Sequence, residues 1–251
     1  VDFTGEVIRF SRPWHLFQHC AQAIAHDFRL LTAGRRSQHI DGTNTILGDP
    51  AQVFLEEGAV VEASILNTKA GPIYIGKGAE VMEGCMLRGP IVIGDHAQVK
   101  MGAKIYGPSA FGPACRVGGE VTNSVILGYS NKGHDGFLGN SVLGEWCNLG
   151  ADTNTSNLKN TYGNVQVWSG VEKAMVDSGL QFCGLLMGDH SKSGINTMFN
   201  TGTVVGVAAN VFGGGFPPKY IPGFSWGGAD GFEIHDIERA LSTARRVMER
   251  R

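Results

Sequence analysis

A hydrophobic residue recurs at every sixth position between residues 75 and 117 of the chain. The recurring residues are Ile75, Val81, Leu87, Ile93, Val99, Ile105, Phe111 and Val117. Each is followed four places later by a member of a restricted set: Ala79, Cys85, Ile91, Ala97, Ala103, Ser109, Cys115 and Val121. A six-residue period is neither the alternation of an amphipathic strand nor the roughly 3.6-residue period of a helix. It predicts a coil of short strands joined at corners, with like positions stacked above one another.

In such a coil the larger residue of each hexad fills the interior and the smaller one fits near a corner. Three hexads make one triangular turn, and successive turns lie about 4.8 Å apart, as neighbouring strands do. The fold class is therefore an all-β solenoid, a parallel β-helix. Hexads begin irregularly at Leu47 and return from Met187 to Val211, so we expect the prism to occupy residues 47–215.

The six-residue phase slips by two residues after Val121. Phe137, Leu143 and Leu149 restore it, followed four places later by Ser141, Cys147 and Thr153. A slip beside a cluster of polar residues indicates a site, because repeats lose regularity where function interrupts them. Residues 158–182 leave the pattern and are expected to form an excursion with extra strands.

Two flanking segments do not follow the repeat. In residues 1–46 the pattern predicts a short strand over Val7–Phe10, a helix of about 18 residues from Pro13, and a polar linker over 32–46. Residues 216–251 are expected to form an extended segment and a helix. The apolar stripe of that helix packs on the prism or on a neighbouring subunit, and it consists of Ile234, Ile237, Leu241, Ala244 and Met248.

Composition narrows the class of partner and compartment. The 251 residues are 42% hydrophobic and 18% charged with a net charge of −2, so neither nucleic acid nor an anionic membrane is an expected partner. No segment approaches the roughly 20 apolar residues of a membrane span. The five cysteines lie far apart without a CxxC pair, and we expect them to be reduced and structural in a cytoplasmic protein. We expect no metal site.

The spacing and residue classes resemble the hexapeptide-repeat acyltransferases. That resemblance implies a left-handed β-helix, a hand that periodicity alone does not give. RPWHLF, from Arg12, resembles the helix that links a nucleotidyltransferase domain to the β-helix in two-domain sugar-nucleotide enzymes, although an ordinary packing helix explains the same residues. The chain starts at Val1 and lacks the GxGTR phosphate loop of that domain. We therefore expect residues 1–46 to be the remnant of a junction to an absent domain.

The slipped segment contains a spaced motif. GHDGFLGN starts at Gly133, CNLGADT starts at Cys147, and an asparagine follows at Asn157. This resembles the acetyltransferase motif of the bifunctional glucosamine-1-phosphate acetyltransferase/N-acetylglucosamine-1-phosphate uridyltransferase family, G-H-x-x-[YF]-[LI]-G-[DN], V-N-[IL]-G-A-G-T and a later Asn. The resemblance implies a catalytic base at His134, sugar contacts at Phe137 and Asn148, and coenzyme contacts at Gly150, Ala151 and Asn157.

These residue types suit acyl transfer to an amine. An amine that attacks a thioester must lose a proton, and a neutral imidazole with a pKa near 6.5 can accept it. Asparagine side chains offer both a donor and an acceptor to sugar hydroxyls. Backbone N–H groups at glycine-rich corners can stabilise the oxyanion of the tetrahedral intermediate.

Three departures from the family pattern leave the acceptor open. The family's Tyr is Phe137, GAGT has become GADT with Asp152, and the family's sugar-phosphate Lys falls at Thr122. Lys132 stands one place from a nearby family Lys, so we assign phosphate binding to Lys132 and Arg116; Lys100 and Lys104 are further possibilities.

The prediction is an acyltransferase that uses acetyl-CoA to N-acetylate an amino-sugar phosphate in nucleotide-sugar synthesis. The resemblance also implies a homotrimer with each site between adjacent prisms. The alternative is a non-catalytic trimerisation or regulatory module of a sugar-phosphate nucleotidyltransferase. A metal-dependent carbonic anhydrase of the same fold needs histidine ligands at a spacing that this chain does not supply.

Overall fold

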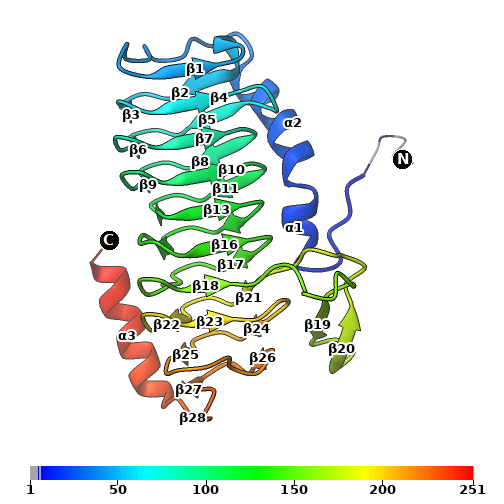
Figure 1. Cartoon of the computed structure of the whole chain (residues 1–251). Coiled ribbons are helices and arrows are strands. Elements are labelled where there is room, and N and C mark those ends of the chain that lie inside the picture. Colours follow the sequence, from blue (N-terminus) through cyan, green and yellow to red (C-terminus); the bar gives the residue numbers. More distant parts are fainter. Residues whose placement is uncertain (1–4, 6, 251) are drawn as a thin grey trace.

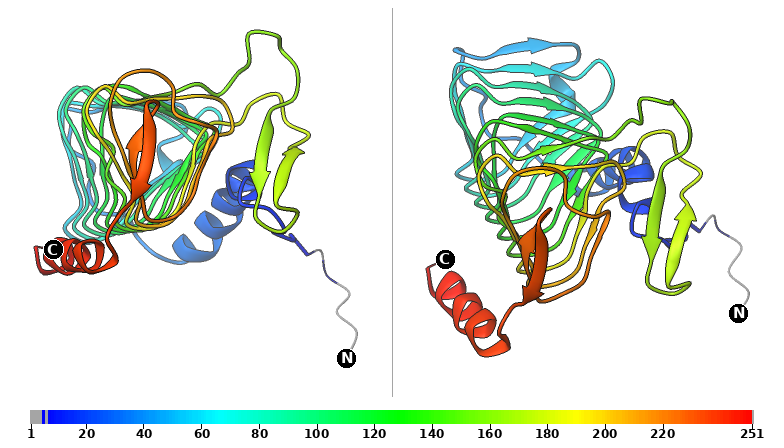
Figure 2. Two further views of the ribbon diagram at one scale, coloured as in Figure 1. Left: turned by 90° about the horizontal axis from the view of Figure 1, so that it is seen from below. Right: turned by 60° about the horizontal axis from the view of Figure 1, so that its bottom comes forward.

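The computed structural model describes residue 5 and residues 7–250, and its body is a parallel β-helix. Figure 1 shows the coils stacked from β1 at one end to β27 at the other, and Figure 2 shows the stack along its axis. Each coil contributes one short strand to each of three faces. The β-solenoid with a helical segment at either end confirms the expected fold class.

We name the faces by their strands. Face A holds β1 (Thr45–Leu47), β4 (Ile65–Asn67), β7 (Met86–Arg88), β10 (Lys104–Tyr106), β13 (Glu120–Thr122) and β16 (Phe137–Gly139), continued by β18 (Asn154–Thr155) and β23 (Met198–Phe199). Face B holds β2 (Val53–Leu55), β5 (Ile73–Ile75), β8 (Ile91–Ile93), β11 (Ser109–Phe111), β14 (Val125–Ile126), β17 (Val142–Leu143), β21 (Leu186–Met187), β24 (Val204–Val205) and β26 (Tyr220–Ile221).

Face C carries the strands that matter most for the site. It holds β3 (Val60–Val61), β6 (Glu80–Val81), β9 (Gln98–Val99), β12 (Arg116–Val117), β15 (Asn131–Lys132), β22 (Lys192–Ser193), β25 (Asn210–Val211) and β27 (Ser225–Gly228), with β28 (Gly231–Ile234) antiparallel to β27. Isolated bridges at Asn148 join β15 to β22. A short 3-10 turn, η1 (Pro50–Gln52), precedes β2.

The interior is the hexad column expected from the sequence. Leu87 pairs with Ile105, 18 positions later, and both are fully buried. The smaller residues at the corners, such as Ala103 and Cys115, are equally buried. All five cysteines are free and buried, and three of them are corner fillers, as expected. One continuous apolar core therefore runs through the prism.

The slip lies two residues earlier than expected. Ile105 pairs with Val121, only 16 positions later, so the shortened part is the corner at Gly118–Glu120. Val121 consequently takes the large inward place and not the small one. One coil further on, Leu138 pairs with Val121 and is fully buried, whereas Phe137 points outward and is half-buried. The expectation that Phe137 fills the interior is thus wrong, because the step from Leu138 to Leu143, both inward, is five residues and not six.

The amino-terminal segment packs against the prism as two helices. They are α1 (His15–Gln18) and α2 (Cys20–Thr32), separated at His19. Trp14, Phe17 and Val142 belong to a second apolar core that also receives the hairpin of the excursion. That hairpin, β19 (Gln166–Ser169) and β20 (Ala174–Asp177), confirms the extra strands expected within 158–182. Residues 7–10 form no strand; the described part contains no helix long and apolar enough to cross a membrane.

The carboxyl-terminal part extends the prism before it leaves it. β26 and β27 join faces B and C, so stacked strands continue past the expected boundary at 215. The final helix, α3 (Ile237–Glu249), begins at the cap Asp236 and runs beside the lower coils (Figures 1 and 2). Its buried residue is Ala240, while Leu241 and Met248 stay exposed. The apolar stripe therefore does not pack on this prism.

Replacing Leu138 tests the shifted register. We expect Leu138→Ala to lower the free energy of unfolding by about 2–5 kcal/mol, because it leaves a cavity in the column. Phe137→Leu, which alters a half-buried side chain, should cost clearly less. Urea unfolding followed by circular dichroism measures both, and the reverse order would contradict the register.

Candidate active site

Five of the residues assigned from the sequence line one groove. Arg116, His134, Asn148, Gly150 and Ala151 surround a cavity of about 460 Å³ at the corner between faces C and A. Its lining is completed by other residues of the same coils and by the end of α3: Lys100, Asn131, Gly133, Leu149, Ile195 and Arg250. The imidazole of His134 is exposed at this corner. The structure therefore brings the candidate base together with the candidate sugar contact Asn148 and the candidate coenzyme contacts Gly150 and Ala151.

The register of face C explains why these residues meet. Arg116 pairs with Asn131, which pairs with Asn148, which pairs with Lys192. Successive coils thus place four polar side chains in one outward column. The Nδ2 of Asn131 donates a hydrogen bond to Oδ1 of Asn148 at 3.2 Å. That bond holds the Asn148 amide in one orientation beside the groove.

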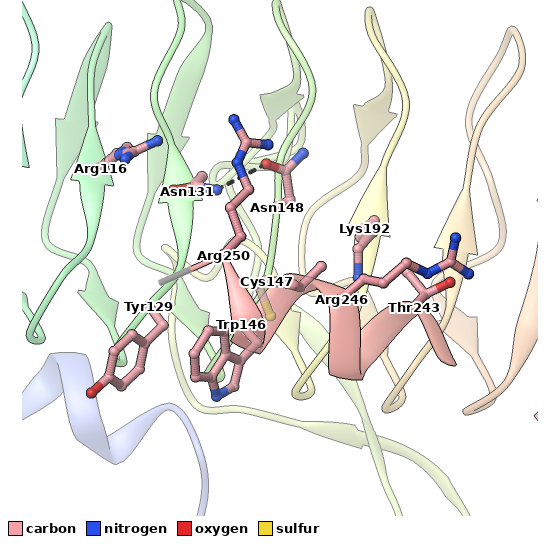
Figure 3. A pocket seen from close by; sticks show the side chains of 11 residues that line it. Arg116, Tyr129, Asn131, Trp146, Cys147, Asn148, Lys192, Thr243, Arg246 and Arg250 are labelled. Carbon is pink, nitrogen blue, oxygen red and sulfur yellow. Dashed lines mark hydrogen bonds between the residues drawn. The ribbon is translucent and has the colours of Figure 1, made fainter. Parts of the chain in front are cut away.

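A second cavity of about 470 Å³ adjoins the first along face C (Figure 3). α3 closes one side of it with Arg246 and Arg250, and Arg250 extends toward Asn131 and Asn148. Arg116 and Lys192 add positive charge, and no carboxylate is among its lining residues within the described chain. The sequence interpretation missed the two arginines of α3. Their spacing of one helical turn is apparent in the sequence, but the sequence does not indicate that the helix lies against face C.

Aromatic rings form the far edge of this second cavity. Tyr129 and Trp146 stack with ring centroids 4.2 Å apart, and His190 continues the column at 6.0 Å from Trp146. All three have positive φ, between 58° and 60°, since they occupy equivalent corners of successive coils. His190 is half-buried, and burial lowers its pKa. The rings cover one another's faces, and Tyr129 and Trp146 line the cavity.

Asn157 lies apart from His134, at the other edge of face A, and the ring of Phe137 extends toward it over Gly139. Asn157 donates through Nδ2 to Oδ1 of Asn140 at 2.8 Å. The Phe137 ring and the Asn157 amide both lie directly over Gly139. A Cβ at Gly139 would stand 2.6 Å from Cζ of Phe137 and 2.6 Å from this Nδ2, so a residue with a side chain does not fit there. His134 precedes β16 and Asn157 follows the adjoining β18. Within one subunit the two therefore stand at opposite ends of these strands.

Lys132 faces the interior and not the groove. Its side chain is 1% exposed, and its ammonium donates to the carbonyl oxygens of Gly118, at 3.0 Å, and of His134. The assignment of Lys132 to a substrate phosphate therefore does not fit the structure. Burial lowers the pKa of Lys132 to about 8, although the nearby carboxylates of Asp135 and Asp152 oppose that shift.

The surroundings of Cys147 and of the backbone amides limit the other reactions that the groove can support. Burial raises the pKa of the Cys147 thiol to about 12, so it is not a thiolate nucleophile at neutral pH. The described residues contain no group of three or more side chains able to hold a metal ion. The amide of Gly150 already donates to the carbonyl oxygen of Ser193 at 3.1 Å. The amide of Ala151 has no hydrogen-bond acceptor among the described residues and remains available to an oxyanion.

The fold and the groove define a hexapeptide-repeat β-helix protein with a candidate acyl-transfer site. No protein-family model matches the chain. It is 33% identical to the bifunctional protein GlmU of Methanococcus aeolicus over 87 residues, which are 35% of this chain and 20% of that protein. It is also 33% identical to the bifunctional sugar-1-phosphate nucleotidylyltransferase/acetyltransferase of Sulfurisphaera tokodaii over 95 residues, 38% of this chain and 23% of that protein.

The matched region thus spans about a fifth of the length of these curated relatives. Among solved structures, a hexapeptide transferase family protein from Anaplasma phagocytophilum aligns over 83% of this chain and 86% of its own. With 16% identity and a TM-score of 0.36, that likeness carries no argument about function. The chain resembles the hexapeptide-repeat acyltransferases, as the relatives and the motif around His134 both indicate.

We expect the difference in the free energy of unfolding between the wild type and Lys132→Met to depend on pH. The folded pKa of about 8 lies below the ordinary value of 10.5, so between these values the unfolded chain binds more protons. The free energy of unfolding of the wild type should therefore rise with pH relative to Lys132→Met, by up to roughly 3 kcal/mol. The wild type has this added stability in full above pH 10.5, the pKa of the lysine in the unfolded chain. It loses the added stability as the pH falls from there through the folded-state pKa of about 8.

Urea unfolding of both proteins at about pH 7 and about pH 10 measures this difference. Other titrating groups cancel because the two chains differ at one residue. A difference that stays constant across this range would show that the ammonium is not buried as described.

Proposed function

We propose that this chain is an acyltransferase that moves an acyl group, acetyl in the simplest case, from coenzyme A to the amine of an amino-sugar phosphate. The observation that carries the proposal is the groove that His134 shares with Asn148, Gly150 and Ala151. The name of the Sulfurisphaera tokodaii relative, which joins a sugar-1-phosphate nucleotidylyltransferase to an acetyltransferase, supports the same reaction class.

In the proposed reaction the acceptor amine attacks the thioester carbonyl carbon, and the imidazole of His134 takes the proton that the amine sheds. A tetrahedral intermediate forms, with negative charge on the former carbonyl oxygen. The free amide of Ala151 is the donor best suited to that oxygen. The C–S bond then breaks, and the imidazolium returns its proton to the departing thiolate of coenzyme A. The products are the amide and the free thiol.

The two cavities suggest how the acceptor is oriented. Asn131 and Asn148, joined by a hydrogen bond, offer amide groups to sugar hydroxyls. Arg116, Arg246 and Arg250 surround the adjoining space and suit a phosphate, which arginine can bind with two parallel hydrogen bonds. A sugar whose amine reaches His134 would then direct its phosphate along face C toward α3.

We further propose that the active assembly is a homotrimer. The candidate coenzyme contact Asn157 stands at one end of the β16–β18 strands and His134 at the other, so a complete site needs a second copy. The outer side of face A carries an apolar strip that a second prism can cover. The strip consists of Leu47, Ile65, Met86 and Tyr106, which are 39–46% exposed.

His134→Ala tests the assignment of the base. With acetyl-CoA and glucosamine 1-phosphate, we expect the variant to lose roughly 100- to 10,000-fold in kcat, the usual contribution of a general base. Thiol release from coenzyme A, followed with a thiol reagent, gives the rate. The matched control is His96→Ala, which removes another exposed corner histidine that lines neither cavity and should keep the wild-type rate.

Equal rates in wild type and His134→Ala would remove the base from the proposal. No thioester turnover in the wild type with any amino-sugar phosphate would favour the alternative, a non-catalytic trimerisation or regulatory module. The departures at Phe137 and Thr122 are the observations that keep that alternative in view.

Met86→Glu tests the assembly. A carboxylate placed in the apolar strip would have to be desolvated at the interface, so we expect the trimer to dissociate. Sedimentation equilibrium should give a mass near 27 kDa for the variant, against three times that for the wild type. Val171→Glu, on an exposed apolar residue of the hairpin tip, is the control and should leave the mass unchanged. A monomeric wild type would contradict the proposal.

A further inference from the structure

One inward column of the prism is interrupted by a charge. Along face C the inward positions of the first five coils are Val61, Val81, Val99, Val117 and Lys132, each paired with the next. The bridge between Asn131 and Asn148 then places Leu149 beside Lys132. A lysine in such a column needs an explanation, because an ammonium withdrawn from water must be hydrogen-bonded.

The shape of the neighbouring corners provides it. In the regular coils a small side chain fills the interior of the corner after face C, as Cys85 and Ala103 do. The corner at Gly118–Glu120 is two residues shorter and lacks this filler. In the next coil the filler position falls on Gly136, which has a φ of +110° and no side chain. Two successive corners thus lack a filler, and the long side chain of Lys132 reaches into them.

Its ammonium ends on the backbone of both corners. It donates to the carbonyl oxygen of Gly118 at 3.0 Å and to that of His134. The two corners also touch directly, since a Cβ on Gly119 would lie 2.8 Å from the same oxygen of His134. Within residues 7–250 the bond from Lys132 is the one hydrogen bond made by His134. The residue that carries the candidate base is therefore held from inside the prism.

We propose that Lys132 is a positioning residue that fixes the peptide of His134 and so aims the exposed imidazole into the groove. This inference rests on the proposed function for its catalytic consequence, but its structural part stands alone. The ammonium replaces the missing corner side chains and binds the one backbone acceptor that leads directly to the base. Without the ammonium, the glycine-rich segment Gly133–Gly136 would lose the hydrogen bond that holds its backbone to the interior.

The test is Lys132→Met, which keeps an unbranched apolar side chain in the column and removes the ammonium. With acetyl-CoA and glucosamine 1-phosphate, we expect kcat to fall roughly 10- to 100-fold, the effect of a small misplacement of a reacting group. The KM for acetyl-CoA should stay within about two-fold, because Lys132 does not line either cavity. In parallel, hydrogen exchange of the Glu120 and Asp152 amides, which donate to the carbonyl oxygens of Gly136 and Asp135, should accelerate at least roughly ten-fold.

Val81→Ala is the matched control. It removes buried methyl groups from the same column but touches neither corner, so it should lower stability while kcat and the exchange of the Glu120 and Asp152 amides remain as in the wild type. Lys132→Gln is a second variant that keeps an N–H donor for one carbonyl. It should recover part of kcat and part of the protection, and it serves as the test if Lys132→Met does not fold.

Unchanged kcat together with unchanged exchange in the variants would overturn the proposal. Changes of equal size in Val81→Ala would overturn it too, because they would reveal a general loss of stability. If the wild type itself shows no turnover, the proposed function fails. The exchange measurement then still decides whether Lys132 anchors the His134 corner.

Discussion

Parallel stacking is the constraint from which the rest of this structure follows. Every residue on a face lies directly above its counterpart one coil away, and its backbone bonds run to that counterpart. A change in the length of one coil is therefore passed to every later position. The coil shortens from 18 residues to 16 between Ile105 and Val121, and one further residue is lost between Val121 and Ile126, so the inward and outward assignments of the following residues are reset.

The candidate site arises at this reset. The shortened corner at Gly118–Glu120 leaves an unfilled interior, Lys132 enters it, and the following corner carries His134 outward with its carbonyl tied inward. The same register stacks Arg116, Asn131 and Asn148 on the outside of face C. A buried cation and an exposed imidazole thus depend on one local change in chain length. α3 adds Arg246 and Arg250 to the Arg116 that face C supplies.

The repeat and the motif could be predicted from the sequence, because the repeat has a fixed period and the motif has a fixed spacing of residues. Six-residue periodicity predicted the solenoid, and the motif from Gly133 to Ala151 brought His134, Asn148 and Ala151 to one groove. Periodicity could not locate the slip within a corner, since Val121 is apolar and satisfies either the small or the large position. Counting back six residues from Leu143 misplaced the inward position at Phe137, because the step from Leu138 to Leu143 is five residues. The inward direction of Lys132 was also hidden, because a lysine near a polar motif is normally a surface residue.

The excursion between β18 and β21 shows what this architecture allows. The chain leaves the prism after Thr155, forms the β19–β20 hairpin, and returns so that Val142 pairs with Leu186 as if nothing had intervened. Length is therefore free at a corner and fixed along a face. In evolutionary terms, a corner can gain a whole substructure without loss of the core. A single residue inserted within a face strand would instead exchange the inward and outward positions of that strand. New surfaces on such a scaffold arise at its edges.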